Sequence, residues 1–237
     1  MSIRIEKIVP PSIHQWEGVI QGMRNPMNSW AKSDTTWDVI EDPSPCNPED
    51  WVYIKIGPND MDLMKRLAKA GGDHRKYLRM LPVVLDVTAP LFWWKEYDTY
   101  KVGTVANSCS TMHTIHLKEF TLDDFSFETC RKTQIPDSQN SWVLFGLKPC
   151  IAQTVDILNK ARTAFLMTKD ERFWRYMIEL LPSSYNQKRT LFLNYEVLWN
   201  MYQARKGHKL IEWREFCGAI VREVPYFKEI FGIEEAQ

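Results

Sequence analysis

The sequence predicts an α+β fold, with a central mixed sheet and a helix-rich C-terminal half. Two observations lead to this prediction. Residues 82–88 are rich in β-branched side chains, and residues 2–9 alternate apolar with charged side chains, as strands do. From residue 149 onward, apolar residues recur instead at the three- and four-residue spacing of amphipathic helices.

The N-terminal part is expected to contain two helices around a long irregular segment. Apolar residues at helical spacing predict a helix over 13–23. Asn59 and Asp60 can cap a second helix over 60–70, which a glycine pair would end. Residues 24–58 are rich in Pro, Asn, Ser and Asp. Because structureless loops of that length are uncommon, we expect this segment to be functional or to face a partner.

The remaining elements are expected to be helices. Pro90 suits the first turn of the helix that follows the strand. Asp170 is a favourable capping residue for a later helix, which Pro182 would follow. The predicted helices cover residues 91–100, 149–168, 170–181, 187–205 and 209–223.

Composition excludes several classes of protein. The chain has 237 residues, 44% of them apolar and 25% charged, as expected for one sizeable globular domain. Thirty basic residues balance thirty acidic ones, so a bulk attraction to nucleic acid or to an anionic membrane is not predicted. Any bound anion must therefore be held by a local cluster of donors.

Cysteine and tryptophan usage add two expectations. The five cysteines are odd in number and none forms a Cys-x-x-Cys pair, which argues against a disulfide framework and a zinc knuckle. With no apolar signal region and no run of about 18 apolar residues, a cytoplasmic protein is expected. Ten tryptophans are many, and those among polar residues are expected either at an interface or as partly buried core aromatics. These are Trp30, Trp37, Trp51 and Trp142.

Two segments carry candidate binding chemistry. Residues 181–190 form a Ser- and Asn-rich turn that includes Lys188 and Arg189, and its free backbone N–H groups could hold an anion. The alternative is a capped helix with an exposed basic pair. Residues 99–111 are mostly small polar or hydroxyl-bearing, so they could approach a phosphate or a ring edge closely. The alternative here is a polar surface loop.

Two further groups are weighed as catalytic or metal-binding residues. His113, His116 and Glu119 would share a face if they were helical, but the spacing is a weak metal signal and no metal is predicted. Cys109 is the only cysteine in a candidate pocket segment, and it is expected to be a small packing residue rather than a nucleophile.

Together these segments resemble the flavin-dependent thymidylate synthase (ThyX) family between His74 and Arg205. Family members carry a His, a strand, an Ala-Pro, an aromatic helix, and an Arg-His-Arg followed seven residues later by Ser. Here Ala89-Pro90 opens the helix and Thr99-Tyr100-Lys101 takes the place of Arg-His-Arg. The C-terminal match consists of Leu181-Pro182, Lys188, Asn194, Leu198, Asn200 and Arg205.

The resemblance implies a single ThyX-like domain over residues 1–237, with a divergent arm at 1–58 and a recognisable core at 59–225. It implies a homotetramer with sites between subunits, which binds FAD and the pyrimidine nucleotide dUMP and uses NADPH and methylene-tetrahydrofolate. The flavin-facing residues would be His74, Arg79, Tyr100, Lys101, Asn194 and Asn200. The nucleotide-facing residues would be Glu96, Asn107, Ser108, Cys109, Ser110, Lys188 and Arg205.

The signature segment departs from the family pattern. Thr99 and Tyr100 replace an arginine and a histidine, and Lys101 keeps a charge without the bidentate fork. Cys109 and Thr111 replace a serine and an arginine that hold the nucleotide phosphate. Two functions follow. One is a divergent flavoenzyme that methylates or hydroxymethylates a pyrimidine nucleotide at C5. The other is a non-catalytic nucleotide-binding or sequestering protein, of the kind that a phage or other mobile element would encode. A third hypothesis is a structural oligomer that binds no ligand.

Overall fold

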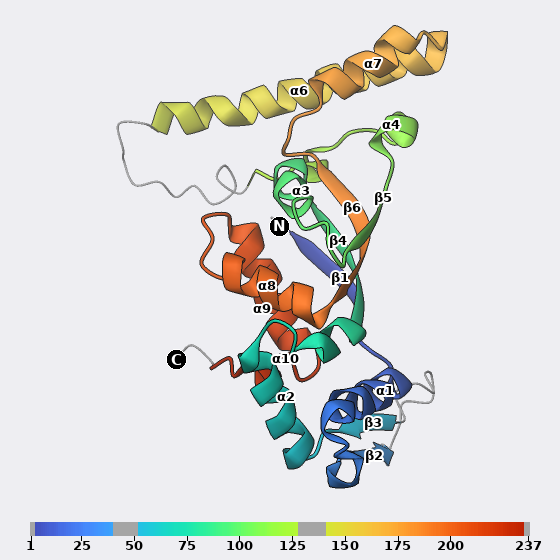
Figure 1. The fold of residues 1–237 in the computed structure, drawn as a ribbon. Coiled ribbons are helices and arrows are strands. Elements are labelled where there is room, and N and C mark those ends of the chain that lie inside the picture. Colours follow the sequence, from blue (N-terminus) through green and yellow to red (C-terminus); the bar gives the residue numbers. More distant parts are fainter. Residues whose placement is uncertain (1–2, 40–51, 128–140, 235–237) are drawn as a thin grey trace. The chain divides into compact units, whose positions relative to one another are not determined.

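A computed structural model describes residues 3–39, 52–127 and 141–234 of the chain. Within these ranges the main sheet has four strands in the order β1-β4-β6-β5 (Figure 1). The strands are β1 (Arg4–Val9), β4 (Pro82–Pro90), β5 (Val105–Ser108) and β6 (Asn186–Asn194). The α+β prediction is confirmed, as are strands at 2–9 and 82–88.

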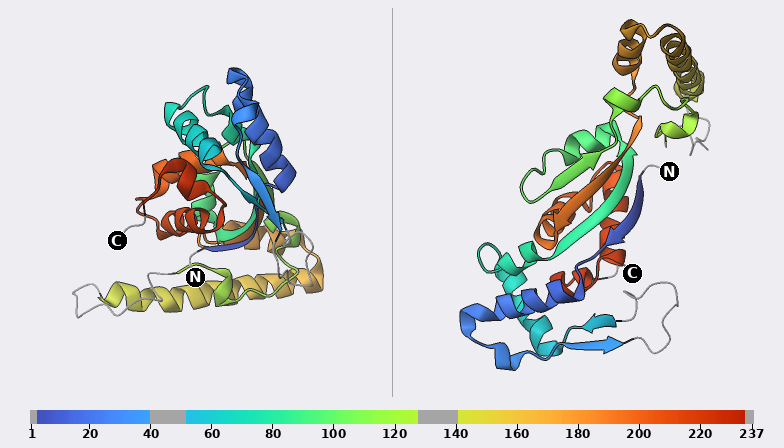
Figure 2. Two further views of the ribbon diagram at one scale, coloured as in Figure 1. Left: turned by 90° about the horizontal axis from the view of Figure 1, so that it is seen from below. Right: turned by 90° about the vertical axis from the view of Figure 1, so that its right-hand side faces the viewer.

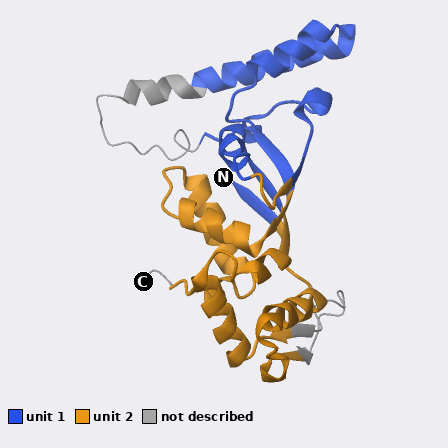
Figure 3. Ribbon diagram, viewed as in Figure 1, with its two compact units in different colours: residues 1–6, 86–100, 106–190 blue, residues 7–85, 101–105, 191–237 orange. Residues whose placement is uncertain are grey.

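The chain divides into two compact units (Figure 3). Unit 1 contains residues 1–6, 86–100 and 106–190, and unit 2 contains residues 7–85, 101–105 and 191–237. Each of the four strands of the main sheet contributes residues to both units. The expected boundary between an arm at 1–58 and a core at 59–225 stays a prediction.

Unit 1 combines one end of the sheet with four helices, α3 (Leu91–Tyr97), α4 (Thr111–Thr114), α6 (Ser141–Thr168) and α7 (Glu171–Leu180). Helices α6 and α7 lie side by side as a hairpin (Figure 2). Asp170 begins α7 as predicted, because its side chain accepts a hydrogen bond from the backbone N–H of Arg172. The buried cluster of this unit consists of Ile115, Phe120, Phe125, Leu158, Ala161 and Met177.

Unit 2 contains most of the remaining helices and a small two-stranded sheet. Its helices are α1 (Ile13–Arg24), α2 (Pro58–Ala70), α8 (Tyr195–Arg205), α9 (Ile211–Glu223) and α10 (Phe227–Phe231). Trp16 and Tyr195 meet edge to face, with ring centroids 5.7 Å apart, in the core of this unit. Among the described residues, no helix is long and apolar enough to cross a lipid bilayer.

The helix predicted over 187–205 is wrong in its first half. Residues 186–194 form strand β6, and helix α8 starts only at Tyr195. The physical reason is a period of two, since Leu191 and Leu193 are fully buried while Phe192 between them is 45% exposed. Asn194 begins α8 by accepting a hydrogen bond from the Val197 backbone N–H.

The segment predicted to be irregular at 24–58 also contains regular structure. Strands β2 (Thr36–Val39) and β3 (Val52–Lys55) pair antiparallel there. Of the tryptophans expected at interfaces, Trp30 is exposed and Trp37 is half-buried, while the other two side chains lie outside the described residues. The described cysteines Cys109, Cys150 and Cys217 are free thiols.

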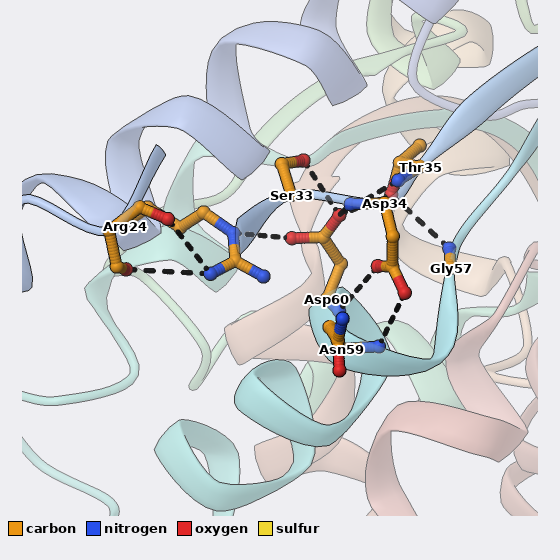
Figure 4. A network of polar contacts seen from close by, with 8 residues as sticks. Arg24, Ser33, Asp34, Thr35, Gly57, Asn59 and Asp60 are labelled. Carbon is orange, nitrogen blue, oxygen red and sulfur yellow. Dashed lines mark hydrogen bonds and ion pairs between the residues drawn. The ribbon is translucent and has the colours of Figure 1, made fainter. Parts of the chain in front are cut away.

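The start of α2 differs from the prediction in a way that matters for stability (Figure 4). Gly57, not Asn59 or Asp60, precedes the helix. Asp60 is fully buried and pairs with the buried Arg24, whose Nε lies 2.6 Å from the Asp60 Oδ1. Asp60 also accepts hydrogen bonds from Ser33 Oγ, Asp34 N, Thr35 N and Thr35 Oγ1.

This network shifts the Asp60 carboxyl toward its charged form. Burial alone would raise the pKa of Asp60, but hydrogen bonds from Thr35, Ser33 and Arg24 outweigh it and hold the pKa below its usual value. Asp34 in turn accepts hydrogen bonds from the Asn59 and Asp60 backbone N–H groups. Hydrogen bonds from Ser33, Asp34 and Thr35 therefore hold the segment before α2 against the start of that helix, and the Arg24–Asp60 pair links α2 to α1.

Candidate functional site

Unit 1 contains a cleft of about 280 Å³ whose wall comes from four parts of the chain. Arg4 comes from β1, Thr88 from β4, and Lys188 from β6. The segment after β5 supplies the opposite wall, from Cys109 to Asp124. A second hollow of about 520 Å³ adjoins the cleft and shares five lining residues with it. The shared residues are Arg4, Thr88, Lys118, Asp124 and Asn186.

Backbone hydrogen bonds hold the Cys109 segment against β6. The Cys109 N–H donates to the Lys188 carbonyl at 2.9 Å. The Gln187 Nε2 donates to the Cys109 carbonyl at 2.8 Å. Ser110 then caps the short helix α4 by accepting from the His113 N–H at 3.0 Å. The structure thus brings together three residues predicted to face the nucleotide, Cys109, Ser110 and Lys188.

The lysines of the cleft are paired with carboxylates. The Lys188 Nζ lies 3.0 Å from Asp86 Oδ2 and 3.1 Å from Glu6 Oε2, and the hydrogen bonds of Asp86 and Glu6 raise the pKa of Lys188. The Lys118 Nζ lies 2.9 Å from Asp124 Oδ1. Burial would raise the pKa of Asp124, but hydrogen bonds from Lys118 and Thr121 lower it below its usual value. The raised pKa keeps Lys188 charged at neutral pH.

Aromatic side chains form the apolar part of the cleft. Phe120 and Tyr185 both line it, with ring centroids 6.4 Å apart at a steep angle. Phe125 supports Tyr185 from behind, edge to face, at 5.6 Å. Burial raises the pKa of Tyr185, so its hydroxyl stays protonated at neutral pH. The cleft therefore offers ring surfaces, hydroxyl groups and cations to one ligand.

A separate polar cluster lies in unit 2. Glu196, at the start of α8, pairs with both Arg75 and Arg79 through the Nε atoms of the two guanidinium groups. Arg75 also donates from Nη2 to the Asn200 Oδ1 at 3.3 Å. Burial would raise the pKa of Glu196, but the hydrogen bonds of Arg79 and Arg75 lower it. Two residues predicted to face flavin therefore belong to one cluster. Arg79 pairs with Glu196, and Asn200 accepts from Arg75, the other partner of Glu196.

The other predicted site residues occupy scattered positions. Within unit 2, His74 and Lys101 are exposed, Asn194 caps α8, and the half-buried Arg205 has its guanidinium 4.8 Å from the Trp213 ring centre. Within unit 1, the remaining four line neither hollow. They are the half-buried Glu96 and Tyr100 and the exposed Asn107 and Ser108.

Sequence reasoning missed several residues of the cleft. Arg4 and Thr88 enter it only because β1, β4 and β6 are neighbours in the sheet. No local pattern marks such a juxtaposition, since the strands are far apart in the chain. The two histidines and the glutamate weighed as metal ligands do not gather, and within the described residues no group of three His, Cys, Asp or Glu side chains could hold a metal ion.

Comparison with solved structures gives the fold a name. The chain is similar to flavin-dependent thymidylate synthase ThyX from Helicobacter pylori complexed with FAD and dUMP, with a TM-score of 0.61 and 16% identity, over 98% of this chain and 97% of that one. A second structure of that protein with FAD and dUMP gives the same TM-score and identity, over 98% and 96%. The fold is that of flavin-dependent thymidylate synthase. The ThyX-like fold covers both units, so the structural likeness extends well beyond the segment from His74 to Arg205.

No family model matches the sequence, and no curated protein matches it. At 16% identity the likeness to ThyX concerns the fold, and the chemistry must be argued from the residues of this chain.

The Glu196 cluster makes part of the stability depend on pH. Because the folded pKa of Glu196 is lower than its ordinary value of 4.5, its contribution is complete above that pH and is lost as the pH falls through the folded pKa. We expect the Glu196→Gln variant to have a lower free energy of unfolding than the wild type near pH 7. This difference between the two proteins should become smaller as the pH falls into the acid range. Urea unfolding at a series of pH values measures the gap.

The exposed Glu223, which lies beside Arg222, provides a matched control for this series. The Glu223→Gln variant should follow the wild type at every pH. A gap for Glu196→Gln that is constant from neutral to acid pH would contradict the proposed linkage.

Proposed function

We propose that this chain binds a pyrimidine nucleotide in the cleft of unit 1. The proposal rests on one observation: Cys109, Ser110 and Lys188 line the same cleft. The family resemblance implies a nucleotide contact for each of these three residues. The two ThyX structures with the same fold contain dUMP, which supports the same class of ligand here.

The chemistry of the cleft suits such a ligand. A pyrimidine ring is flat and apolar on its faces, and the half-buried Tyr185 offers a ring surface to pack against it. Ser110, Thr111 and Thr114 line the same cleft and bring hydroxyl groups that can donate or accept at the base and sugar. The volume of the cleft and its adjoining hollow falls near the roughly 300–1,000 Å³ of small-molecule sites.

The residues implied for flavin binding fit FAD less well than the cleft fits a pyrimidine nucleotide. FAD carries two phosphates, which need free guanidinium or N–H donors. Arg75 and Arg79 direct their Nε atoms at Glu196, and that carboxylate would repel a pyrophosphate beside it. This internal pairing supports a nucleotide-binding protein that works without flavin.

The favoured function is therefore nucleotide binding or sequestration without catalysis. The second candidate is flavin-dependent methylation or hydroxymethylation of the nucleotide at C5, with NADPH and methylene-tetrahydrofolate. It is supported by the ThyX structures of the same fold, in which a thymidylate synthase binds FAD and dUMP. We also propose that the chain forms a homotetramer, which light scattering on the full-length protein tests.

Two measurements on the purified full-length protein, its visible absorbance and its melting temperature with added ligands, distinguish the two candidate functions. We expect no visible flavin absorbance, no change in melting temperature with FAD, and a rise in melting temperature with dUMP. Protein that is purified yellow, or that is stabilised by dUMP only when FAD is also present, would favour the flavoenzyme. Protein that dUMP does not stabilise under either condition would remove the proposed function.

A further inference from the structure

Arg4 differs from the other cations of the cleft in its pairing. Lys118 is paired with Asp124 at 2.9 Å, and Lys188 is shared by Asp86 and Glu6 at 3.0 and 3.1 Å. Arg4 lies on β1, its side chain is exposed, and no acidic side chain in the described part of the chain pairs with it. Arg4 thus brings a full positive charge to the cleft.

The position of Arg4 is as informative as its charge. It lines both the cleft and the adjoining hollow, together with Lys118 and Asn186. The aromatic residues Phe120 and Tyr185 line the cleft but not the adjoining hollow. A base packed on the Tyr185 ring would leave its sugar and phosphate to extend toward the region that the two hollows share.

We propose that Arg4 is the phosphate-binding residue of the cleft and that it makes the cleft specific for nucleotides over nucleosides. This inference rests on the proposed function. A phosphate monoester carries a charge of about −1.5 to −2 near pH 7, and a guanidinium can bind it through two parallel N–H···O bonds. Arg4 would thereby supply, from β1, the guanidinium that the family resemblance implies at the position of Thr111.

Acidic side chains around the two hollows restrict where an anion can go. Glu119 lines the cleft and Asp123 lines the adjoining hollow, while Asp124, which Lys118 neutralises, lines both. Because like charges repel, a dianionic group is disfavoured beside these carboxylates and favoured beside Arg4. The same carboxylates disfavour a ligand with several phosphates, so the ligand class is a nucleoside monophosphate.

The test compares dUMP with deoxyuridine, which differs only by the phosphate, in calorimetric titrations of the full-length protein. Arg4→Gln should weaken dUMP binding about 10- to 100-fold and leave deoxyuridine binding unchanged. Arg4→Lys should recover part of the loss, since it restores the charge without the fork. Arg66→Gln, which changes an exposed arginine of α2 in unit 2, should bind both ligands as the wild type does.

The outcomes separate this inference from the proposed function. If the wild type binds both ligands and Arg4→Gln binds them equally well, or weakens both to the same extent, the role of Arg4 is wrong while nucleotide binding stands. If the wild type binds neither ligand, the proposed function fails and the inference fails with it. An unchanged melting temperature for Arg4→Gln shows that the variant is folded.

Discussion

Replacing Asp60 with alanine is expected to lower the free energy of unfolding by about 3–5 kcal/mol, because it leaves a buried charge without its partner. Arg24 is 3% exposed and its Nε–Oδ1 distance to Asp60 is 2.6 Å. Its Nη2 is buried and has no hydrogen-bond partner among the described residues, so loss of Asp60 would leave both Nε and Nη2 unsatisfied and only Nη1 bonded, to Ser29. Ser33 and Thr35 would lose an acceptor in the same step.

Urea unfolding of the full-length protein measures this loss, with Asp62→Ala as the matched control. Asp62 lies two residues away on α2 and pairs with Arg66 at 2.8 Å, but both side chains are exposed. Exposed ion pairs contribute about 0–1 kcal/mol, so the control should change stability little. If the two variants lowered the free energy of unfolding equally, the claim that the buried Asp60–Arg24 ion pair holds α1 and α2 together would be contradicted.

Replacing Lys188 with glutamine is expected to weaken dUMP binding by about 100-fold, near the upper end for loss of one charged donor. The loss has two causes. The ligand loses a cation, and Glu6 and Asp86 lose the lysine that now neutralises them, so their negative charge acts more strongly on an anion in the cleft. Calorimetric titration with dUMP measures the change.

A double variant separates charge from structure in this prediction. Lys188 neutralises the carboxylates of Glu6 and Asp86 in the wild type. Adding Glu6→Gln to Lys188→Gln removes one of these two charges and should recover part of the lost affinity. Lys69→Gln, which changes an exposed lysine of α2, should bind dUMP as the wild type does. Full affinity in Lys188→Gln would contradict the placement of the nucleotide in this cleft.

Local patterns in the sequence predicted the elements that local physics determines. Asp170 caps α7, and the helix over 13–23 and the strand over 82–88 are present with small shifts at their ends. The α+β class and the ThyX-like fold are confirmed. The prediction was wrong at 187–205, because tertiary burial of Leu191 and Leu193 makes a strand of residues that also suit a helix.

The candidate site was only partly accessible to sequence reasoning. Cys109, Ser110 and Lys188 stood out through their chemistry and the family resemblance, and they do meet in the cleft. Arg4 and Thr88 did not stand out, since strand order places them there. Glu196 was also missed, because its importance comes from Arg75 and Arg79, which precede it by more than a hundred residues.

The most direct test of nucleotide binding without flavin is a calorimetric titration of dUMP into full-length protein that has been stripped of any flavin. We expect saturable binding, with the same affinity when an excess of FAD is present. Absence of binding in both titrations would contradict the proposed ligand, and binding that requires FAD would contradict the flavin-independent function.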